Sequence, residues 1–206
     1  AALGGISTRT WPAIGAALDV DQIAAMIRPA GYPSVPTRAI AVEQTHNLGG
    51  GTVIGLETLR GLRAVADQAG VALHCDGARI WHAHIADAVP LSSYGELFDT
   101  LSVCLSKGLG APVGSLVVGG AERIAQARFI RKRMGGGMRQ VGILAAAGLV
   151  ALDTMVDRLA EDHRRARLLA AAVAERWPDA GCDPAQVVTN VVLFRHADPA
   201  KLLAAL

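Results

Sequence analysis

The chain has 206 residues, 51% of them hydrophobic, enough to bury the core of one large domain or of one domain and part of another. Its 20 Lys and Arg residues nearly balance 18 Asp and Glu residues, so global charge indicates neither a nucleic-acid partner nor a membrane surface. The 3 cysteines lack a Cys-x-x-Cys spacing, which argues against a disulfide framework or a thiolate zinc site and favours a reducing, cytoplasmic compartment.

The first part of the chain alternates between predicted strands and a helix. An apolar run that ends in polar residues predicts a strand over residues 37–47. Leucines at helical spacing, with a glycine as a stop, predict a helix over residues 55–70. Strands are predicted within VALHCDGAR (71–79), TLSVCLSKG (100–108) and GSLVVGG (114–120).

The second part of the chain is predicted to be mainly helical. A basic helix covers residues 121–134 and leads into a glycine loop. Two helices follow, at roughly 139–160 and 161–177. A late strand is predicted over residues 186–195, and the last residues, 198–206, begin another helix. None of the apolar runs approaches the roughly 20 residues that a membrane span requires.

This order of elements predicts an α/β fold with a mostly parallel central sheet and helices on both faces. The strands are expected to be buried on both faces, because parallel sheets usually are. We expect a large domain over residues 1–157, incomplete at its N-terminal side. Residues 158–206 are expected to form a linking helix and the beginning of a small C-terminal α/β domain.

Polar side chains follow three of the predicted strands. Glu43 and His46 end the first, Asp76 and Arg79 the second, and Lys107 the third. Ligands in such sheets bind beyond the carboxyl ends of the strands. The sequence therefore predicts that these residues converge on one site.

Lys107 is the first candidate. Desolvation lowers the pKa of a lysine, and a neutral amine condenses with an aldehyde to form a Schiff base. Ser106 and the glycines at 108 and 110 leave room for a flat ring. The alternative is a lysine that extends from a strand end into water.

Asp76, Arg79 and His46 each allow a catalytic and a structural interpretation. A carboxylate at a strand end can pair with a protonated pyridine nitrogen, as in pyridoxal-phosphate sites. Arg79 offers a cation for a substrate carboxylate, although the two residues could form a purely structural turn pair. His46 could act as a base or orient a hydroxyl, or be a hydrogen-bonded structural histidine.

The basic segment RFIRKRMGGGMRQ (128–140) is the last candidate. A glycine loop that ends in Arg139 before a helix suits a phosphate or a subunit interface. Nucleic acid is disfavoured, because no set of aromatic residues interleaves the basic ones. The alternative is a solvated basic face that includes Lys132.

The motifs EQTHNLGGG, LHCDGAR, CLSKGLGAPVGS and RKRMGGGMRQVGILAAAG, in this order, resemble the low-specificity L-threonine aldolases. These are fold-type I pyridoxal-phosphate enzymes of the β-eliminating lyase group, with an aminotransferase-like fold. The resemblance implies retro-aldol cleavage of L-threonine or L-allo-threonine to glycine and acetaldehyde. It also implies pyridoxal 5'-phosphate as cofactor, a small amino-acid substrate, no nucleic acid or membrane partner, and a homotetramer, or at least a dimer.

The same resemblance implies a role for each candidate residue. Lys107 would carry the Schiff base with the cofactor, and Asp76 would meet its pyridine nitrogen. Arg79 would hold the substrate carboxylate and lie near the cofactor's phenolic oxygen, while His46 would lie close to the substrate hydroxyl. Residues that would reach the cofactor phosphate of a neighbouring subunit are Arg139 and Lys132. No metal is implied.

The chain also departs from the family pattern. It lacks counterparts of an N-terminal segment with a phosphate cradle and a ring-stacking histidine, and of a far C-terminal segment with a second carboxylate-binding arginine. Gln44 stands where the family commonly has Asn. Two further interpretations therefore stay open: a related lyase such as a phenylserine aldolase, and a non-catalytic oligomerisation remnant of this fold.

Overall fold

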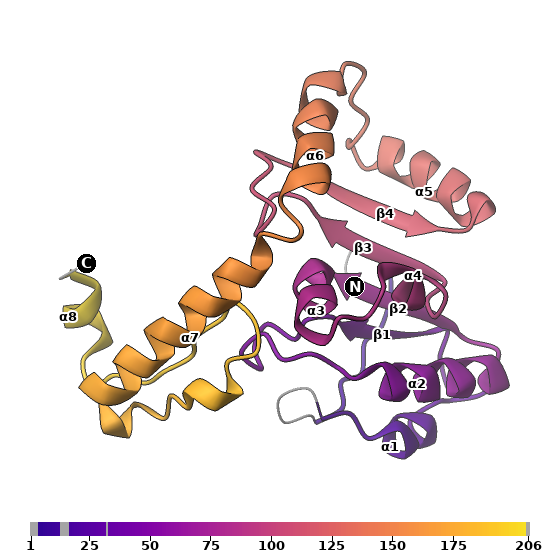
Figure 1. Ribbon diagram of the computed structural model, residues 1–206. Coiled ribbons are helices and arrows are strands. Elements are labelled where there is room, and N and C mark those ends of the chain that lie inside the picture. The colour runs from indigo at the N-terminus through magenta and orange to yellow at the C-terminus, as the bar shows by residue number, and fades with distance from the viewer. Residues whose placement is uncertain (1–3, 13–16, 32, 205–206) are drawn as a thin grey trace.

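The computed structural model describes residues 4–12, 17–31 and 33–204 and has a mixed sheet of order β1-β2-β3-β4 at its centre (Figure 1). The strands β1, β2 and β3 are parallel, and β4 is antiparallel to β3. The predicted α/β fold with a mostly parallel sheet is confirmed. The strands are β1 (Ala39–Glu43), β2 (Ala72–Gly77), β3 (Thr100–Cys104) and β4 (Ser115–Gly119).

Helices connect and follow these strands (Figure 1). The α-helices are α1 (Val20–Ala25), α2 (Leu56–Ala69), α3 (Ile80–Asp87), α4 (Leu91–Gly95), α5 (Ala121–Arg133), α6 (Gly142–Thr154), α7 (Leu159–Arg176) and α8 (Pro199–Ala204), and short 3-10 turns are η1 (Pro178–Ala180) and η2 (Pro184–Gln186). As predicted, α2 ends at Gly70, whose φ of 64° is the left-handed conformation that glycine adopts without steric cost. None of the helices in the described part of the chain is long and apolar enough to cross a membrane.

Several predicted elements differ from the structure. The break between the two late helices lies at residues 155–158, earlier than predicted. Helices α1, α3 and α4 were missed; in α3 a histidine, His82, occupies a core position, so the apolar spacing typical of a helix is absent. The last two residues of the predicted C-terminal helix lie outside the described residues.

The predicted strand over residues 186–195 is wrong, because Gln186 ends η2 and residues 187–195 are irregular chain. A strand needs a neighbouring strand to pair its backbone groups, and among the described residues this segment has none. Its apolar run instead packs on a distant loop. There the hydroxyl of the fully buried Thr189 donates a 2.7 Å hydrogen bond to the carbonyl of Gly51.

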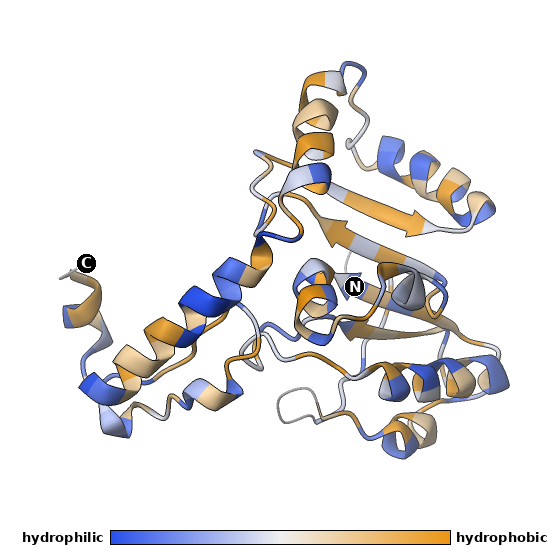
Figure 2. Ribbon diagram, in the orientation of Figure 1, coloured by the Kyte–Doolittle hydropathy of each residue, from blue (hydrophilic) through white to orange (hydrophobic). Residues whose placement is uncertain are grey.

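The sheet is buried on one face, not on both as predicted. Burial alternates along β1, β2 and β3, and the buried positions are Ile40, Val42, Leu73, Cys75, Leu101 and Val103. The opposite face carries small or polar residues such as Ala41, His74 and Ser102, which offer little apolar area to bury. On the edge strand β4, which is apolar along its length in Figure 2, Leu116, Val117 and Val118 are exposed.

A second apolar cluster joins the β3–β4 connection to α6 and α7. Leu105, Leu109, Ala151 and Leu159 are buried in it, and Trp81 of α3 packs against it. The residues around the predicted Schiff-base lysine are therefore held by α3 together with α6 and α7, which lie far from α3 in the sequence.

Candidate active site

The carboxyl ends of β1, β2 and β3 bring polar residues together, as the sequence predicts. In the strand register Asp76 stands between Glu43 and Ser102. Its Oδ1 accepts a 3.1 Å hydrogen bond from the Ala78 amide and a 3.4 Å hydrogen bond from the Ser102 hydroxyl. Asp76 is exposed on the uncovered face of the sheet, so its carboxylate is oriented by the protein and open to a ligand.

Lys107 lies in a tight turn after β3. The amide of Gly110 donates to the carbonyl of Lys107 at 2.9 Å, and the amide of Ala111 donates to the carbonyl of Leu105 at 3.0 Å. Gly110 has a φ of 72°, a conformation that favours glycine. The side chain of Lys107 is exposed, whereas Leu105 and Leu109 on either side are buried. The backbone is thus anchored while the amine is accessible.

Helix α3 joins the second and third strand ends. It begins directly after Arg79, which is half-buried and whose carbonyl accepts from the amide of His82 at 3.0 Å. Trp81, two residues after Arg79, donates its indole N–H to the carbonyl of Cys104 at 2.8 Å. Arg79 is therefore attached to the same helix that holds the end of β3.

His46 lies in a loop after β1 that backbone hydrogen bonds hold in place. Its backbone pairs with Thr52, and its carbonyl accepts from the amide of Gly51 at 2.9 Å. The side chain of Gln44 is fully buried and makes two 3.0 Å hydrogen bonds, to the carbonyl and from the amide of Ile54. The residue that departs from the family pattern thus closes this loop. A Cβ at Gly51 would lie 2.3 Å from the Thr189 hydroxyl, so a side chain there would collide.

Lys132 and Arg139 are not brought to the strand ends in this chain. Both are exposed, at the end of α5 and in the loop that leads to α6. Helix α5 packs against the edge strand β4, so this region lies on the far side of β4 from β1 and β2 (Figure 1). The Lys132 side chain closes over Gly137, where a Cβ would lie 2.6 Å from its Cδ.

Sequence reasoning missed a buried histidine pair beside the site. His82 Nδ1 lies 2.9 Å from His163 Nε2, and the two residues are only 1% and 4% exposed. Burial, then His163, then Arg79 lower the pKa of His82 to about 4. Burial, followed by Arg167, lowers the pKa of His163. The one sequence feature that points to this pair is His82 itself, a histidine that closely follows the Asp-Gly-Ala-Arg motif.

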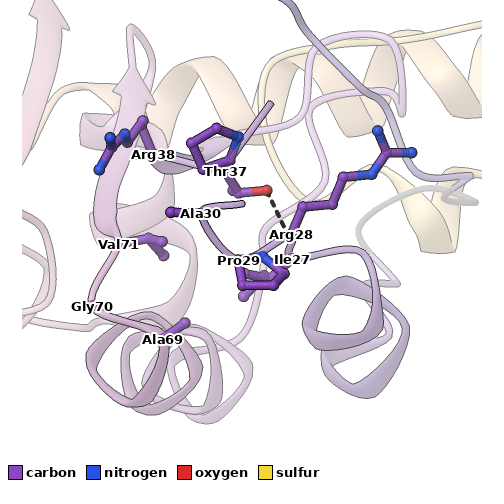
Figure 3. A pocket seen from close by; sticks show the side chains of 10 residues that line it. Ile27, Arg28, Pro29, Ala30, Thr37, Arg38, Ala69, Gly70 and Val71 are labelled. Carbon is purple, nitrogen blue, oxygen red and sulfur yellow. Dashed lines mark hydrogen bonds between the residues drawn. The ribbon is translucent and has the colours of Figure 1, made fainter. Parts of the chain in front are cut away.

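The cavity drawn in Figure 3 lies elsewhere. It has a volume of about 300 Å³, and its lining includes Arg28, Arg38, Gly70 and Val71. Arg38 and Val71 directly precede β1 and β2, Gly70 follows α2 and Arg28 follows α1, so the cavity lies at the opposite end of the strands from Asp76. The candidate site is instead an open edge whose carboxylate, amine and guanidinium suit an anionic ligand with an aldehyde group. The described residues hold no group of three or more His, Cys, Asp or Glu side chains that could bind a metal ion.

Comparison with known proteins identifies relatives that match most of the chain. The family model described as Beta-eliminating lyase matches residues 1–197. Low-specificity L-threonine aldolase 1 of Arabidopsis thaliana is 42% identical over 191 residues, which are 91% of this chain and 52% of that protein. The low specificity L-threonine aldolase of Escherichia coli K12 is 42% identical over 178 residues, 86% of this chain and 51% of that protein. The chain thus spans about half the length of these relatives.

Solved structures agree on the fold. A crystal structure of a putative L-allo-threonine aldolase from Listeria monocytogenes superimposes with a TM-score of 0.73 at 21% identity, covering 84% of this chain and 46% of that one. The threonine aldolase of Leishmania major gives a TM-score of 0.72 at 20% identity, covering 85% of this chain and 52% of that one. At these identities the likeness establishes the architecture of the sheet and its helices.

Proposed function

The chain belongs to the beta-eliminating lyase family, and from this premise we propose that its protein is a pyridoxal-phosphate-dependent aldolase that cleaves L-threonine or L-allo-threonine to glycine and acetaldehyde. The observation that carries the proposal is that Asp76 ends β2 beside Ser102 of β3, the strand that the Lys107 turn follows. The relatives at 42% identity are L-threonine aldolases by name, which supports this substrate class.

The donor set at this edge fits pyridoxal phosphate at its ring and aldehyde ends. The Asp76 carboxylate is open and can pair with a protonated pyridine nitrogen, and the exposed Lys107 amine can bond to the aldehyde. When bound, the cofactor supplies an electron sink for the pair released at the substrate's Cα. Phosphate requires fixed cations, and we assign this role to Arg139 and Lys132 of a neighbouring subunit.

The remaining residues act on the substrate. Arg79 binds the carboxylate of the amino acid, since a guanidinium matches a carboxylate with two parallel hydrogen bonds. His46 accepts the proton of the substrate's β-hydroxyl. As that oxygen forms the carbonyl of acetaldehyde, the Cα–Cβ bond breaks and its electron pair stays at Cα. A proton added to Cα would then give glycine, and the Lys107 amine would hold the cofactor's aldehyde carbon again once glycine has left.

We further propose a cytoplasmic homo-oligomer, a tetramer or at least a dimer, that takes part in threonine catabolism and glycine formation. The assignment of Arg139 to a neighbour's site requires at least two subunits. We also propose a domain division between residues 157 and 158. Helix α7 begins at Leu159, and its C-terminal end extends away from the sheet (Figure 1).

The test is to trap the cofactor on the protein. The intact protein is incubated with pyridoxal phosphate, reduced with borohydride and mapped by peptide mass spectrometry, with the expected pyridoxyl label on Lys107. A second portion of the same cofactor-loaded protein, left unreduced, should release acetaldehyde from L-threonine faster than benzaldehyde from phenylserine. A label on Lys132 or Lys201 instead, or no label, would overturn the assignment of Lys107 as the lysine that binds the cofactor. Faster cleavage of phenylserine would mean that the protein is a phenylserine aldolase.

A further inference from the structure

The buried histidine pair connects two helices that are far apart in the sequence. His82 belongs to α3 and His163 to α7, which pack against each other. Their rings stack with centroids 5.2 Å apart and an interplanar angle of 27°. Since the Nδ1–Nε2 distance is 2.9 Å, one ring donates to the other, and this hydrogen bond is shielded from water.

The pair also contacts the turn that carries Lys107. A Cβ built on Gly108 would lie 2.7 Å from His82 Nε2 and 2.8 Å from Leu159 Cδ2. Leu159 and His163 are one turn apart on α7, so they lie on the same face of the helix. A side chain at residue 108 would therefore collide with a histidine of α3 and a leucine of α7 unless one of them moved.

Charge acts on the pair from both helices. Arg79 lies on the α3 side, Arg167 and Asp162 lie on α7, and Lys107 is the cation of the turn itself. His82 Nε2 is buried without a hydrogen-bond partner among the described residues. Protonating this ring would create a buried donor with nothing to bind, which is costly. The arrangement is therefore built for two neutral rings.

We propose that His82 and His163 are positioning residues: their hydrogen bond holds α7 against α3, and the closed pair fixes the Gly108 backbone and with it the direction of Lys107. Neither ring touches the reacting atoms in this proposal. Their contribution is to limit the conformations of a turn whose amine is otherwise exposed. The inference rests on the proposed function of Lys107 for its meaning, but the structural part of it can be measured without cofactor.

The experiment compares four forms of the intact protein: the unchanged protein, His163→Ala, His163→Gln and His84→Ala. Gln places an amide group near the position of the imidazole Nε2, so it can restore the hydrogen bond without a titratable ring. His84 is the matched control, because it also lies on α3 and hydrogen-bonds through Nδ1, to the carbonyl of Val89 at 2.7 Å. Circular dichroism checks that each form is folded.

The first measurement is amide hydrogen exchange in the cofactor-free protein, on peptides covering residues 105–111. The Gly110 and Ala111 amides are hydrogen-bonded within the turn and report its opening. We expect His163→Ala to speed their exchange about tenfold, the equivalent of one buried hydrogen bond. His163→Gln and His84→Ala should remain near the unchanged protein. The second measurement is the pyridoxal phosphate concentration that labels half of Lys107. This concentration should rise in His163→Ala and stay near that of the unchanged protein in His163→Gln and His84→Ala.

The outcomes separate the positioning role of the histidine pair from the proposed function of the protein. Equal exchange in His163→Ala and His84→Ala overturns the positioning role, and so does equal acceleration in His163→Ala and His163→Gln. If His163→Ala does not fold, His163→Gln decides: fast exchange in this folded form overturns the proposal, and exchange near the unchanged protein supports it. Absence of label from the unchanged protein would instead count against the proposed function, while the exchange result would still stand.

Discussion

The indole Nε1 of Trp81 donates a 2.8 Å hydrogen bond to the carbonyl of Cys104, which joins the first turn of α3 to the last residue of β3. The carbonyl lies three residues before Lys107, and the neighbouring His82 contacts Gly108 directly after it. Two consecutive side chains of one helix therefore hold both sides of the lysine turn.

Trp81→Phe tests this anchor. The variant keeps an aromatic ring but leaves the Cys104 carbonyl without its donor, at an expected cost of about 1–3 kcal/mol in the free energy of unfolding. Urea denaturation of the intact protein measures this loss. Trp177→Phe is the matched control, because Trp177 stacks on Phe194 and phenylalanine keeps a stacking ring there. Equal losses in both variants would mean that the hydrogen bond contributes nothing specific.

Asp76→Ala tests the proposed partner of the pyridine nitrogen. We expect the cofactor to bind still, through Lys107, but threonine cleavage to fall by orders of magnitude, several kcal/mol of activation free energy. Ser102→Ala is the control, since it removes only the 3.4 Å hydrogen bond to the carboxylate and should reduce the rate far less. Acetaldehyde release measures both. Turnover of Asp76→Ala near that of the unchanged protein would leave this carboxylate with a structural role only.

Arg139→Ala tests the assignment across subunits. Loss of a fixed cation should weaken retention of the phosphate-bearing cofactor, and more so at high ionic strength, where residual attraction is screened. Equilibrium dialysis at low and high salt measures this. Mixing this variant with Lys107→Ala subunits should restore part of the activity, because a hybrid can combine Lys107 of one subunit with Arg139 of the other. Hybrids that form and stay inactive would place Arg139 outside a neighbour's site.

The histidine pair predicts how stability depends on pH. The pKa of His82 is lowered from 6.5 to about 4. Between these two pH values His82 is therefore protonated in the unfolded chain but neutral in the folded protein. Stability should therefore be full above about pH 6.5 and fall as the pH drops towards 4, by about 3 kcal/mol. Urea denaturation from pH 7.5 to 4.5 measures the slope.

A double variant, His82→Phe with His163→Leu, is the control for this dependence. It replaces both rings by apolar side chains and should flatten the curve between pH 6.5 and 4.5. The hydrogen bonds of Glu161 to Arg164 and Arg165 lower its pKa from 4.5 to about 2, so this carboxylate contributes to the pH dependence at lower pH. An unchanged slope in the double variant would assign the dependence to groups other than the pair.

The sequence by itself determined the strand ends of this protein. The short apolar runs before Glu43, Asp76 and Lys107 each end in polar residues or glycine, and such runs form strands wherever neighbours are available to pair with them. Parallel strands bring their carboxyl ends to one end of the sheet, so the order of elements was enough to predict that Asp76 and the turn after β3 follow adjacent parallel strands. The end of α2 at Gly70 was also predictable from the sequence, because it depends on the backbone freedom of a single residue.

Tertiary structure decided what local pattern could not. The segment around Thr189 has the composition of a strand, yet it packs on Gly51 because a strand forms only where another strand offers its backbone groups. The distance from His82 to His163 spans 81 positions of sequence, and the enclosure of Gly108 depends on how α7 packs against α3. Such contacts arise from packing between remote helices, whose geometry no window of neighbouring residues contains.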